Sequence, residues 1–294
     1  MNILLIGSEG YVGSGLMFYL MNRGHTVEGI NKQKSICSLN KDYFVKNSFD
    51  TVINCATVMD RSSSNYDISS ASHKINVKAV ENIIGYLQNL ETTFIQISSK
   101  DIYGDVYNEN NTTEGEFSYT PHFLVNEKHP INPMSPYAKS KYISEVLSES
   151  YKKTVTIRIC TCYTDFYRPD KHWIPSIIDK IINKETITLT GRGKQFRDLL
   201  HVNDLGMLIE NITSSNLRGT LINAGGGSSN IQSLLEFIKN IDPNPSLQFV
   251  GSGDFGFAFD SSLANKLYQW TPSIKLLDRL PLMIENIKNK KRDP

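Results

Sequence analysis

The sequence predicts an α/β fold in which helices cover both faces of a parallel sheet. Short apolar segments rich in β-branched residues alternate along the chain with longer segments of helical periodicity. A glycine-rich turn directly follows the first apolar segment, where a strand would pass into a helix. Such alternation is typical of parallel strands joined by crossover helices.

The chain opens with a strand, a helix and a second strand. Residues 2–6 are apolar, Leu16 and Leu20 follow at helical spacing, and a short turn leads to the β-branched segment 26–30. The remaining segments show the same two patterns. Strands are expected at 50–54, 93–98, 154–160, 187–189 and 220–223, and helices at 75–88, 138–151, 173–182, 202–212, 231–241 and 274–287.

A glycine triplet lies between the first strand and the first helix. Its spacing is Gly-x-x-Gly-x-x-Gly, which differs from the commoner Gly-x-Gly-x-x-Gly. Glycines at this place allow a tight turn and let the backbone approach a pyrophosphate, which the helix amides then hold. The pattern by itself also fits an ordinary tight turn. We expect a dinucleotide site made by Gly7, Gly10, Tyr11, Val12 and Gly13.

The end of the second strand is expected to select the dinucleotide. A carboxylate there normally hydrogen-bonds the ribose 2′-hydroxyl and repels a 2′-phosphate. The sequence has Asn31-Lys32-Gln33-Lys34 at this place, with no acid and two cations. We therefore expect Asn31 and Lys32 to contact the cofactor, and NADP to be preferred over NAD. In the alternative interpretation the lysines belong to an ordinary solvated turn.

The residue pattern changes near residue 160: an irregular stretch at 163–172 is followed by glycine clusters and scattered prolines. Residues 1–160 are predicted to form a dinucleotide-binding Rossmann domain, together with part of 198–228. Residues 161–294 are predicted to form mainly the substrate-binding lobe. The predicted fold is thus a Rossmann-type doubly wound parallel sheet with a smaller C-terminal α/β substrate lobe.

Composition and charge exclude several classes of protein. The 294 residues include 31 Lys and Arg against 30 Asp and Glu, a net charge of +1, so no overall field attracts nucleic acid or anionic lipid. The N-terminus has no basic leader, and no apolar run approaches the ~18 residues of a membrane span. We expect a cytoplasmic protein without nucleic-acid or membrane partners.

The four cysteines are scattered, and only Cys160 and Cys162 lie close enough together to suggest a zinc-ligand spacing. We expect this pair to be buried thiols on one face of a strand in a reducing compartment. No metal site is expected.

Three residues distant in sequence have the chemistry for proton transfer next to a nicotinamide. Tyr137 and Lys141 are four residues apart at the start of an expected helix, so their side chains share one face. A nearby ammonium favours the phenolate and brings a tyrosine pKa from ~10 toward the neutral range. Ser99 follows the strand at 93–98, at the sheet edge where ligands bind, and its hydroxyl is suited to hold the reacting oxygen. Together with the glycine turn, the trio predicts nicotinamide redox chemistry.

Three further segments complete a known pattern. They are Val52-Ile53-Asn54-Cys55-Ala56, His73-Lys74-Ile75-Asn76-Val77 and Gln195-Phe196-Arg197-Asp198-Leu199-Leu200-His201-Val202-Asn203-Asp204. Over nearly its whole length the chain resembles the extended short-chain dehydrogenase/reductases that act on nucleotide sugars, the NAD-dependent epimerase/dehydratase family.

This resemblance implies a nucleotide-diphosphate sugar as the substrate and places Cys55, Ala56 and Asn76 at the cofactor. It implies Arg197 as the ligand of the diphosphate, since a guanidinium suits that bidentate task. It also implies a homodimer formed through the helices at 75–88 and 138–151, although burial against the sheet explains their apolar stripes equally well. The substrate contacts that it implies are Ser99, Lys100, Tyr103, Arg197 and His172.

Two departures from the family pattern bear on the reaction. The nucleotide-sugar 4,6-dehydratases carry Asp-Glu after the catalytic hydroxyl residue, whereas this chain has Lys100-Asp101, so water elimination lacks its proposed acid. The GDP-fucose synthases, which are reductases, carry a His before an Ile-Pro element, and Lys171-His172-Trp173-Ile174-Pro175 is similar. Asp101 and His172 are therefore candidates for a second acid/base pair, unless His172 faces solvent or caps its helix.

The sequence leaves more than one reaction open. The leading hypothesis is an NADP-preferring reductase of a nucleotide-activated 4-keto-6-deoxy sugar, in which Tyr137 donates the proton, Ser99 holds the oxygen and Lys141 tunes Tyr137 and binds ribose. It depends on the missing acid at Asn31, since a reductase draws on an exchangeable cofactor pool. The alternative is an epimerase, for example a 4-epimerase, with tightly bound NAD, and a dehydratase ranks below it. A non-catalytic nucleotide-sensing relative would be expected to lack Tyr137 or Lys141, and both are present.

Overall fold

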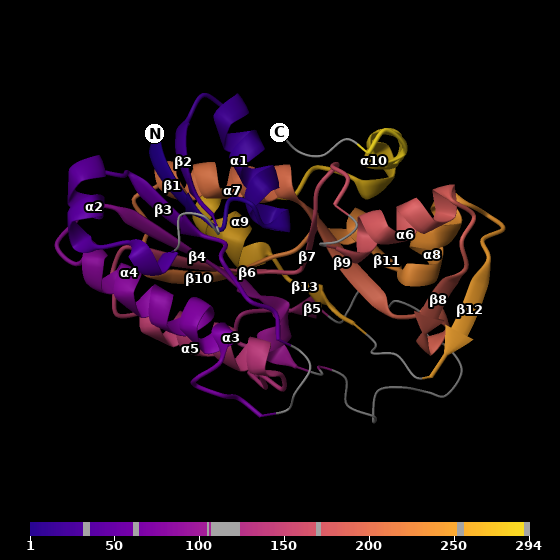
Figure 1. The fold of residues 1–294 in the computed structure, drawn as a ribbon, viewed down its shortest axis with the longest axis horizontal. Coiled ribbons are helices and arrows are strands. Elements are labelled where there is room, and N and C mark those ends of the chain that lie inside the picture. The colour runs from indigo at the N-terminus through magenta and orange to yellow at the C-terminus, as the bar shows by residue number, and fades with distance from the viewer. Residues whose placement is uncertain are drawn as a thin grey trace.

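The computed structural model describes residues 1–31, 36–60, 65–104, 106, 124–168, 172–251 and 256–290. Figure 1 shows a large sheet with helices on both sides of it, and a smaller group of helices and strands beside it. The α/β fold predicted from the sequence is confirmed.

The large sheet has six parallel strands in the order β10-β6-β4-β3-β1-β2. They are β1 (Asn2–Ile6), β2 (Thr26–Ile30), β3 (Thr51–Asn54), β4 (Thr93–Ser99), β6 (Thr154–Ile159) and β10 (Thr220–Ala224). The strand order reverses between β1 and β3, because the chain first winds outward to β2 and then crosses back. Ligands of open α/β sheets bind at such a switch point, outside the carboxyl ends of the strands.

Helices cover both faces of this sheet. They are α1 (Tyr11–Asn22), α7 (Val202–Ser214) and α9 (Ser262–Tyr268) on one face, and α2 (Lys41–Asn47), α4 (Ala79–Leu87) and α5 (Pro136–Ser148) on the other (Figure 1). Successive side chains of a strand point to opposite faces, so alternate residues of β1 enter different cores. Ile3 and Leu5 pack in the first core, and Leu4 and Ile6 pack in the second.

Two helices begin earlier than the sequence predicts, because serine side chains cap them. Ser135 Oγ accepts the Ala138 N–H at 3.1 Å, and Pro136 suits the first helical position, so α5 starts at Pro136. Ser70 likewise caps α3 (Ala71–His73). A π-helical turn, η2 (Lys74–Lys78), then precedes α4, where one uniform helix was expected.

The smaller lobe is built on short sheets. Its strands are β7 (Thr161–Tyr163), β8 (Ile187–Thr190), β9 (Phe196–His201), β11 (Ile231–Ser233) and β12 (Leu247–Val250), and its helices are α6 (Trp173–Ile182), α8 (Leu234–Ile241) and α10 (Leu276–Lys288). β8 pairs in parallel with β12, and β9 lies between β7 and β11. The helices pack with these strands around a third apolar core. A further short pair, β5 (Leu124–Val125) and β13 (Ala258–Phe259), is also parallel.

The structure corrects two of the predicted elements in this lobe. The helix expected at 231–241 begins only at Leu234, because Ser233 and Glu236 form a capping box in which each side chain accepts a backbone N–H of the other residue. The strand expected at 187–189 is β8. It pairs with β12, so it is not a strand of the central parallel sheet.

The last strand of the first half of the central sheet is followed almost directly by a strand of the smaller lobe. β6 ends at Ile159, and the chain enters β7 at Thr161; Cys160 and Cys162 are both buried, as expected for core thiols. β10 pairs with β6 of the central sheet, and α7 packs in the core on one face of that sheet. The division into two domains itself stays a prediction. In the part of the chain that the structure describes, no helix is both long and apolar enough to cross a membrane.

A buried ion pair ties the central sheet to α5. Glu145 and Arg158 are 2% and 3% exposed, and Arg158 Nη2 donates to Glu145 Oε2 at 2.7 Å. The Ser98 hydroxyl also donates to Glu145, and Arg158 Nη1 donates to Tyr103 Oη at 2.7 Å. Tyr103 in turn donates to Asn223 Oδ1 at 2.9 Å. The network therefore joins α5 to β4, β6 and β10.

Removing the charge of Glu145 should destabilise the fold. Glu145→Gln leaves the Arg158 guanidinium buried without its counter-ion, and breaking such a pair costs about 3 kcal/mol. Urea unfolding followed by circular dichroism measures the free energy of unfolding. Glu149→Gln, at the exposed C-cap position directly after the same helix, is the matched control, and it should change stability by less than about 0.5 kcal/mol. Equal stability of the two variants would contradict the assigned role of the pair.

Candidate active site

The glycine turn is closed so tightly that side chains cannot enter it. Gly7 has a φ of +85°, and a Cβ on it would lie 2.6 Å from the Ala56 backbone nitrogen. A Cβ on Gly13 would lie 2.1 Å from the Gly7 carbonyl oxygen. The Gly10 N–H donates to the same oxygen at 2.9 Å. Helix α1 can therefore start directly against the ends of β1 and β3, and phosphates can approach the bare backbone.

The N-terminus of α1 is suited to hold those phosphates. Among the described residues no side chain caps it, so its first turn, which includes Val12 and Gly13, presents backbone amides to an anion at the positive end of the helix dipole. The Tyr11 ring stacks on His172 with the centroids 4.4 Å apart, and its hydroxyl accepts the Thr164 N–H at 3.3 Å. The predicted dinucleotide cradle fits this geometry.

The ends of β2 and β3 border the cradle. Asn31 directly follows β2, and its Nδ2 donates to Glu9 Oε1 at 2.8 Å. Cys55 and Ala56 follow β3, and the Cys55 N–H donates to Ile6 O at 2.9 Å. The predicted cofactor residue Lys32 lies outside the described residues.

Helix α5 packs against β4 and brings Lys141 to the strand that ends in Ser99, while the assembly of the full trio stays a prediction. Ser99, the last residue of β4, is 8% exposed, and Tyr137, the second residue of α5, is 6% exposed. Lys141 lies one turn beyond Tyr137 and donates from Nζ to Ile97 O at 2.8 Å. Lys141 is thus fastened to the strand that carries Ser99. The short 3₁₀ turn after that strand, η3 (Lys100–Tyr103), also packs against α5.

The electrostatics around Lys141 are set by burial. Desolvation lowers the pKa of its ammonium to about 8, while the charges of Cys55 and Glu145 act in the opposite direction. A lysine that titrates near neutral pH in a ligand crevice is typical of a functional position. Desolvation raises the pKa of the Cys55 thiol to about 12, so this cysteine is no nucleophile at neutral pH.

The Asn76 side chain connects the segment that follows β3 to helix α5 through hydrogen bonds. Its Oδ1 accepts the Val58 N–H at 2.8 Å, and its Nδ2 donates to Val58 O at 2.9 Å and to Ser140 Oγ at 2.8 Å. The π-helical turn η2 places this side chain between the segment that follows β3 and helix α5. Asn76 thus positions the chain at the cofactor site, whereas its direct contact with a cofactor stays a prediction.

His172 caps helix α6, which is the alternative role that the sequence analysis left open for it. Its Nδ1 accepts the Ile174 N–H at 3.3 Å at the start of α6, and its ring is stacked on Tyr11. Asp101 lies on η3, where its backbone N–H donates to Ser99 Oγ at 3.2 Å. The acid/base pair formed by Asp101 and His172 stays a prediction.

Two predicted substrate residues follow Ser99. Lys100 Nζ lies 4.9 Å from the centroid of the Phe257 ring, a cation–π distance. Tyr103 is only 1% exposed, and its hydroxyl is used by Arg158 and Asn223. Tyr103 is therefore part of a buried hydrogen-bond network, and its predicted contact with the substrate stays a prediction.

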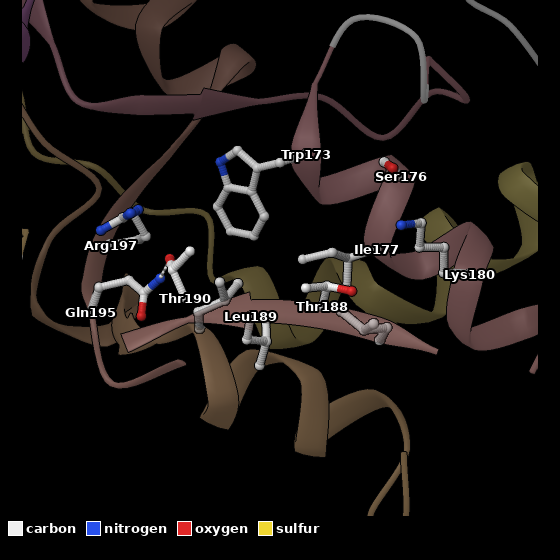
Figure 2. Close-up of a pocket in the computed structure, with 11 residues that line it drawn as sticks. Trp173, Ser176, Ile177, Lys180, Thr188, Leu189, Thr190, Gln195 and Arg197 are labelled. Atoms are coloured by element: carbon white, nitrogen blue, oxygen red, sulfur yellow. Dashed lines mark hydrogen bonds between the residues drawn. The ribbon is translucent and has the colours of Figure 1, made fainter. Parts of the chain in front are cut away.

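A pocket lies beside the predicted diphosphate ligand. It encloses about 280 Å³ between α6 and β8. Figure 2 shows the Trp173 indole and the Arg197 guanidinium on the same side of β8, with Gln195 donating to Thr190. Its walls are mainly apolar, with a few polar and cationic groups, as is common for ligand pockets. The lining residues are Trp173, Ser176, Ile177, Lys180, Ile187, Thr188, Leu189, Thr190, Gln195, Arg197 and Leu234.

The sequence interpretation missed most of this pocket. Of the lining residues, only Arg197 is predicted from the sequence as a substrate ligand. The apolar patterns of Trp173, Ile177 and Leu189 indicate core residues of a helix and a strand. Their gathering depends on how α6 packs over β8, which periodicity does not reveal. It also missed Glu9, whose contact with Asn31 joins two loops. In the described residues, no cluster of three or more His, Cys, Asp or Glu could hold a metal ion.

Comparison with known proteins identifies the family. The profile of the NAD dependent epimerase/dehydratase family matches residues 3–225. The chain therefore belongs to this family, whose members are NAD-dependent nucleotide-sugar enzymes of the extended short-chain dehydrogenase/reductase type.

Full-length relatives are similar to the chain at low identity. A Methanocaldococcus jannaschii protein, provisionally named UDP-glucose 4-epimerase, is 25% identical over 99% of both chains. UDP-glucuronic acid decarboxylase 1 of Arabidopsis thaliana is 25% identical over 99% of this chain and 70% of its own length. The UDP-glucuronic acid 4-epimerase of Bacillus cereus, solved with UDP-glucuronic acid and NAD, superposes with a TM-score of 0.82 at 22% identity, over 98% of this chain and 99% of its own. That likeness confirms the fold.

A methyl group at Gly13 should abolish dinucleotide binding. Gly13→Ala forces the backbone at Gly7 to move, because the added Cβ would lie 2.1 Å from a carbonyl oxygen. We expect the affinity for NADH, measured by fluorescence titration, to fall by at least about tenfold through loss of the phosphate cradle. Gly85→Ala is the control, because its Cβ would meet open space in α4. Wild-type affinity in Gly13→Ala would show that phosphates do not bind at this turn.

The buried ammonium of Lys141 should cost stability at neutral pH. Its folded pKa of about 8 lies below the ordinary lysine value of 10.5, so the unfolded chain binds more protons between these pH values. The free energy of unfolding should therefore rise with pH in this window, and the full cost should be present below it. Lys141→Met should stabilise the protein at pH 7 by about 1–3 kcal/mol, a gain that disappears toward pH 10.5. Denaturant unfolding across this range measures the effect, and the exposed control Lys152→Met should show neither the gain nor its pH dependence.

Proposed function

We propose that the protein is a nucleotide-sugar 4-epimerase that keeps NAD bound through its catalytic cycle. The observation that supports this choice most directly is the position of His172. The reductase hypothesis used His172 and Asp101 as a second acid/base pair. In the structure His172 caps α6 and stacks on Tyr11, so a structural role accounts for it. An epimerase needs only the trio of Ser99, Tyr137 and Lys141.

Dehydration has less support from the residues at the end of β4. Elimination of water needs an acid and a base next to the sugar, and family dehydratases carry Asp-Glu after the catalytic hydroxyl residue. Lys100 stands in place of that acid, and its amine lies over the Phe257 ring. The full-length similarity to a protein provisionally named UDP-glucose 4-epimerase points in the same direction.

The trio supplies what epimerisation at a carbinol carbon requires. The dinucleotide, when bound, supplies a reversible hydride acceptor. Tyr137 takes the proton of the sugar hydroxyl and returns it after the keto sugar has turned. Ser99 donates a hydrogen bond to the same oxygen, and the Lys141 ammonium favours the phenolate. The glycine cradle and the first turn of α1 would hold the pyrophosphate.

The pocket between α6 and β8 is the proposed place of the substrate nucleotide. Trp173 and Leu189 offer apolar surface to a base, and Arg197 offers a cation to the diphosphate. We propose a UDP-sugar, because a UDP-glucose epimerase and UDP-glucuronic acid enzymes occur among the relatives and solved structures. The identity of the hexose or hexuronate is left to the assay.

A homodimer remains part of the proposal. Tyr142 and Val146 are 38% and 48% exposed on α5 and lie one turn apart, so they form an apolar strip that a second copy could cover. The other members of that contact would come from α4, as predicted from the family resemblance.

An assay without added cofactor tests the proposed reaction. The purified protein should release NAD when denatured, and it should interconvert UDP-glucose with UDP-galactose, or UDP-glucuronic with UDP-galacturonic acid, as followed by chromatography. Tyr137→Phe should lower turnover by about 10²–10⁴-fold, the usual cost of removing a positioned acid/base, while the released NAD stays unchanged. Net consumption of NADH or NADPH by a keto sugar, without epimerisation, would favour the reductase instead.

His172→Asn separates the two reactions further. Asparagine is itself a good helix cap, so the start of α6 should survive; the stacking on Tyr11 is lost, but epimerase turnover should fall far less than in Tyr137→Phe. A loss as large as that of Tyr137→Phe would restore His172 to the catalytic machinery.

A further inference from the structure

The cofactor preference of the chain depends on charge at the end of β2. In dinucleotide-binding folds an acid at this strand end binds the ribose 2′-hydroxyl and repels a 2′-phosphate. This chain has Asn31 there, and from the sequence alone that residue favoured NADP. The structure changes the argument, because a carboxylate reaches the same place from another loop.

That carboxylate belongs to Glu9 in the glycine turn. The turn runs along the end of β2: the Ser8 N–H donates to Ile30 O at 3.2 Å. One residue further on each side, Asn31 Nδ2 donates to Glu9 Oε1 at 2.8 Å. The backbone of Glu9 is also held, because its carbonyl oxygen accepts from Arg168 Nη2 at 3.0 Å. Glu9 is thus fixed at its main chain and at its side chain.

We propose that Glu9, oriented by Asn31, is the residue that binds the adenosine ribose and selects NAD over NADP. A carboxylate has about four acceptor positions, so a bond from Asn31 leaves capacity for ribose hydroxyls. The exposed side chain lies at the mouth of the cradle, next to the strand end where the ribose is expected. Asn31 is then a positioning residue, and the acid absent from β2 is supplied by the glycine turn. The inference rests on the dinucleotide site of the proposed function.

Cations near this place act in the opposite direction. Arg168 contacts the same loop, but it donates to the carbonyl oxygen of Glu9, and Lys32 and Lys34 lie outside the described residues. A carboxylate at hydrogen-bond distance from a 2′-phosphate would face a dianion. Such like-charge contact costs about tenfold or more in affinity even with strong solvent screening.

Competition between the two dinucleotides tests the inference on the intact protein. The protein is dialysed repeatedly against an equal, large excess of NADH and NADPH until any copurified NAD has exchanged, and the bound dinucleotides are then released and separated by chromatography. The wild type should retain NADH in excess. Glu9→Gln removes the charge with little change in shape, and it should move the bound ratio toward NADPH by at least about tenfold. Asp42→Asn, which neutralises an exposed carboxylate on α2, should leave the ratio unchanged.

A second variant shows that the carboxylate itself matters. Adding Asn31→Asp to Glu9→Gln returns an acid to the end of β2, and it should restore the preference for NADH. An excess of NADPH on the wild type, or a smaller change in Glu9→Gln, would overturn the inference. Because no sugar is present, this outcome is independent of whether the epimerase assay succeeds. Retention of neither dinucleotide would overturn the inference and the proposed function together.

Discussion

The close approach of backbone atoms at Gly7 and Gly13 is the constraint on which the rest of the site depends. Since neither residue has a Cβ, α1 begins in contact with the ends of β1 and β3. This start places Tyr11 where its ring stacks on His172 and its hydroxyl reaches the chain at Thr164. The glycine turn is therefore the proposed cofactor cradle, and it also contacts the smaller lobe through the Tyr11 side chain.

Helix α5 contributes Tyr137 and Lys141 to the proposed trio, and the charge of its Glu145 is neutralised by a residue of the central sheet. Lys141 and Glu145 are one turn apart and both buried, but Glu145 is neutralised by Arg158 from β6. Lys141 instead donates to a backbone carbonyl of β4, and the charge of Glu145 only partly offsets the effect of burial on its pKa. The ammonium is left as a cation of lowered pKa near the start of the helix, where Tyr137 lies. The ion pair of α5 with β6 thus keeps the catalytic end of the helix in place.

Local signals were enough to predict the central sheet, and contacts between distant segments were not predictable. The strands near residues 2–6 and 93–98 are apolar and bounded by turns, and the trio follows from where they end. The sequence predicts a helix from residue 231, whereas Ile231–Ser233 is a strand. Its apolar pattern is short, and its pairing partner, β9, lies far away in sequence. Glu9 is not predictable from local sequence either, because its hydrogen-bond partner Asn31 is 22 residues away. A missing acid at one position therefore did not show that the site lacks an acid.

The first turn of α6 links the two ligand sites. His172 stacks on Tyr11 of the cofactor loop, and the next residue, Trp173, lines the pocket beside Arg197. Trp173 is also held edge-to-face against Phe237 of α8, with the ring centroids 5.6 Å apart. Because adjacent residues of one helix contact both sites, a shift of α6 relative to the sheet would move the nucleotide pocket with respect to the cofactor cradle. In the proposed reaction, the packing of α6 would therefore set the position of the sugar relative to the cofactor, and α5 would supply the groups for proton transfer.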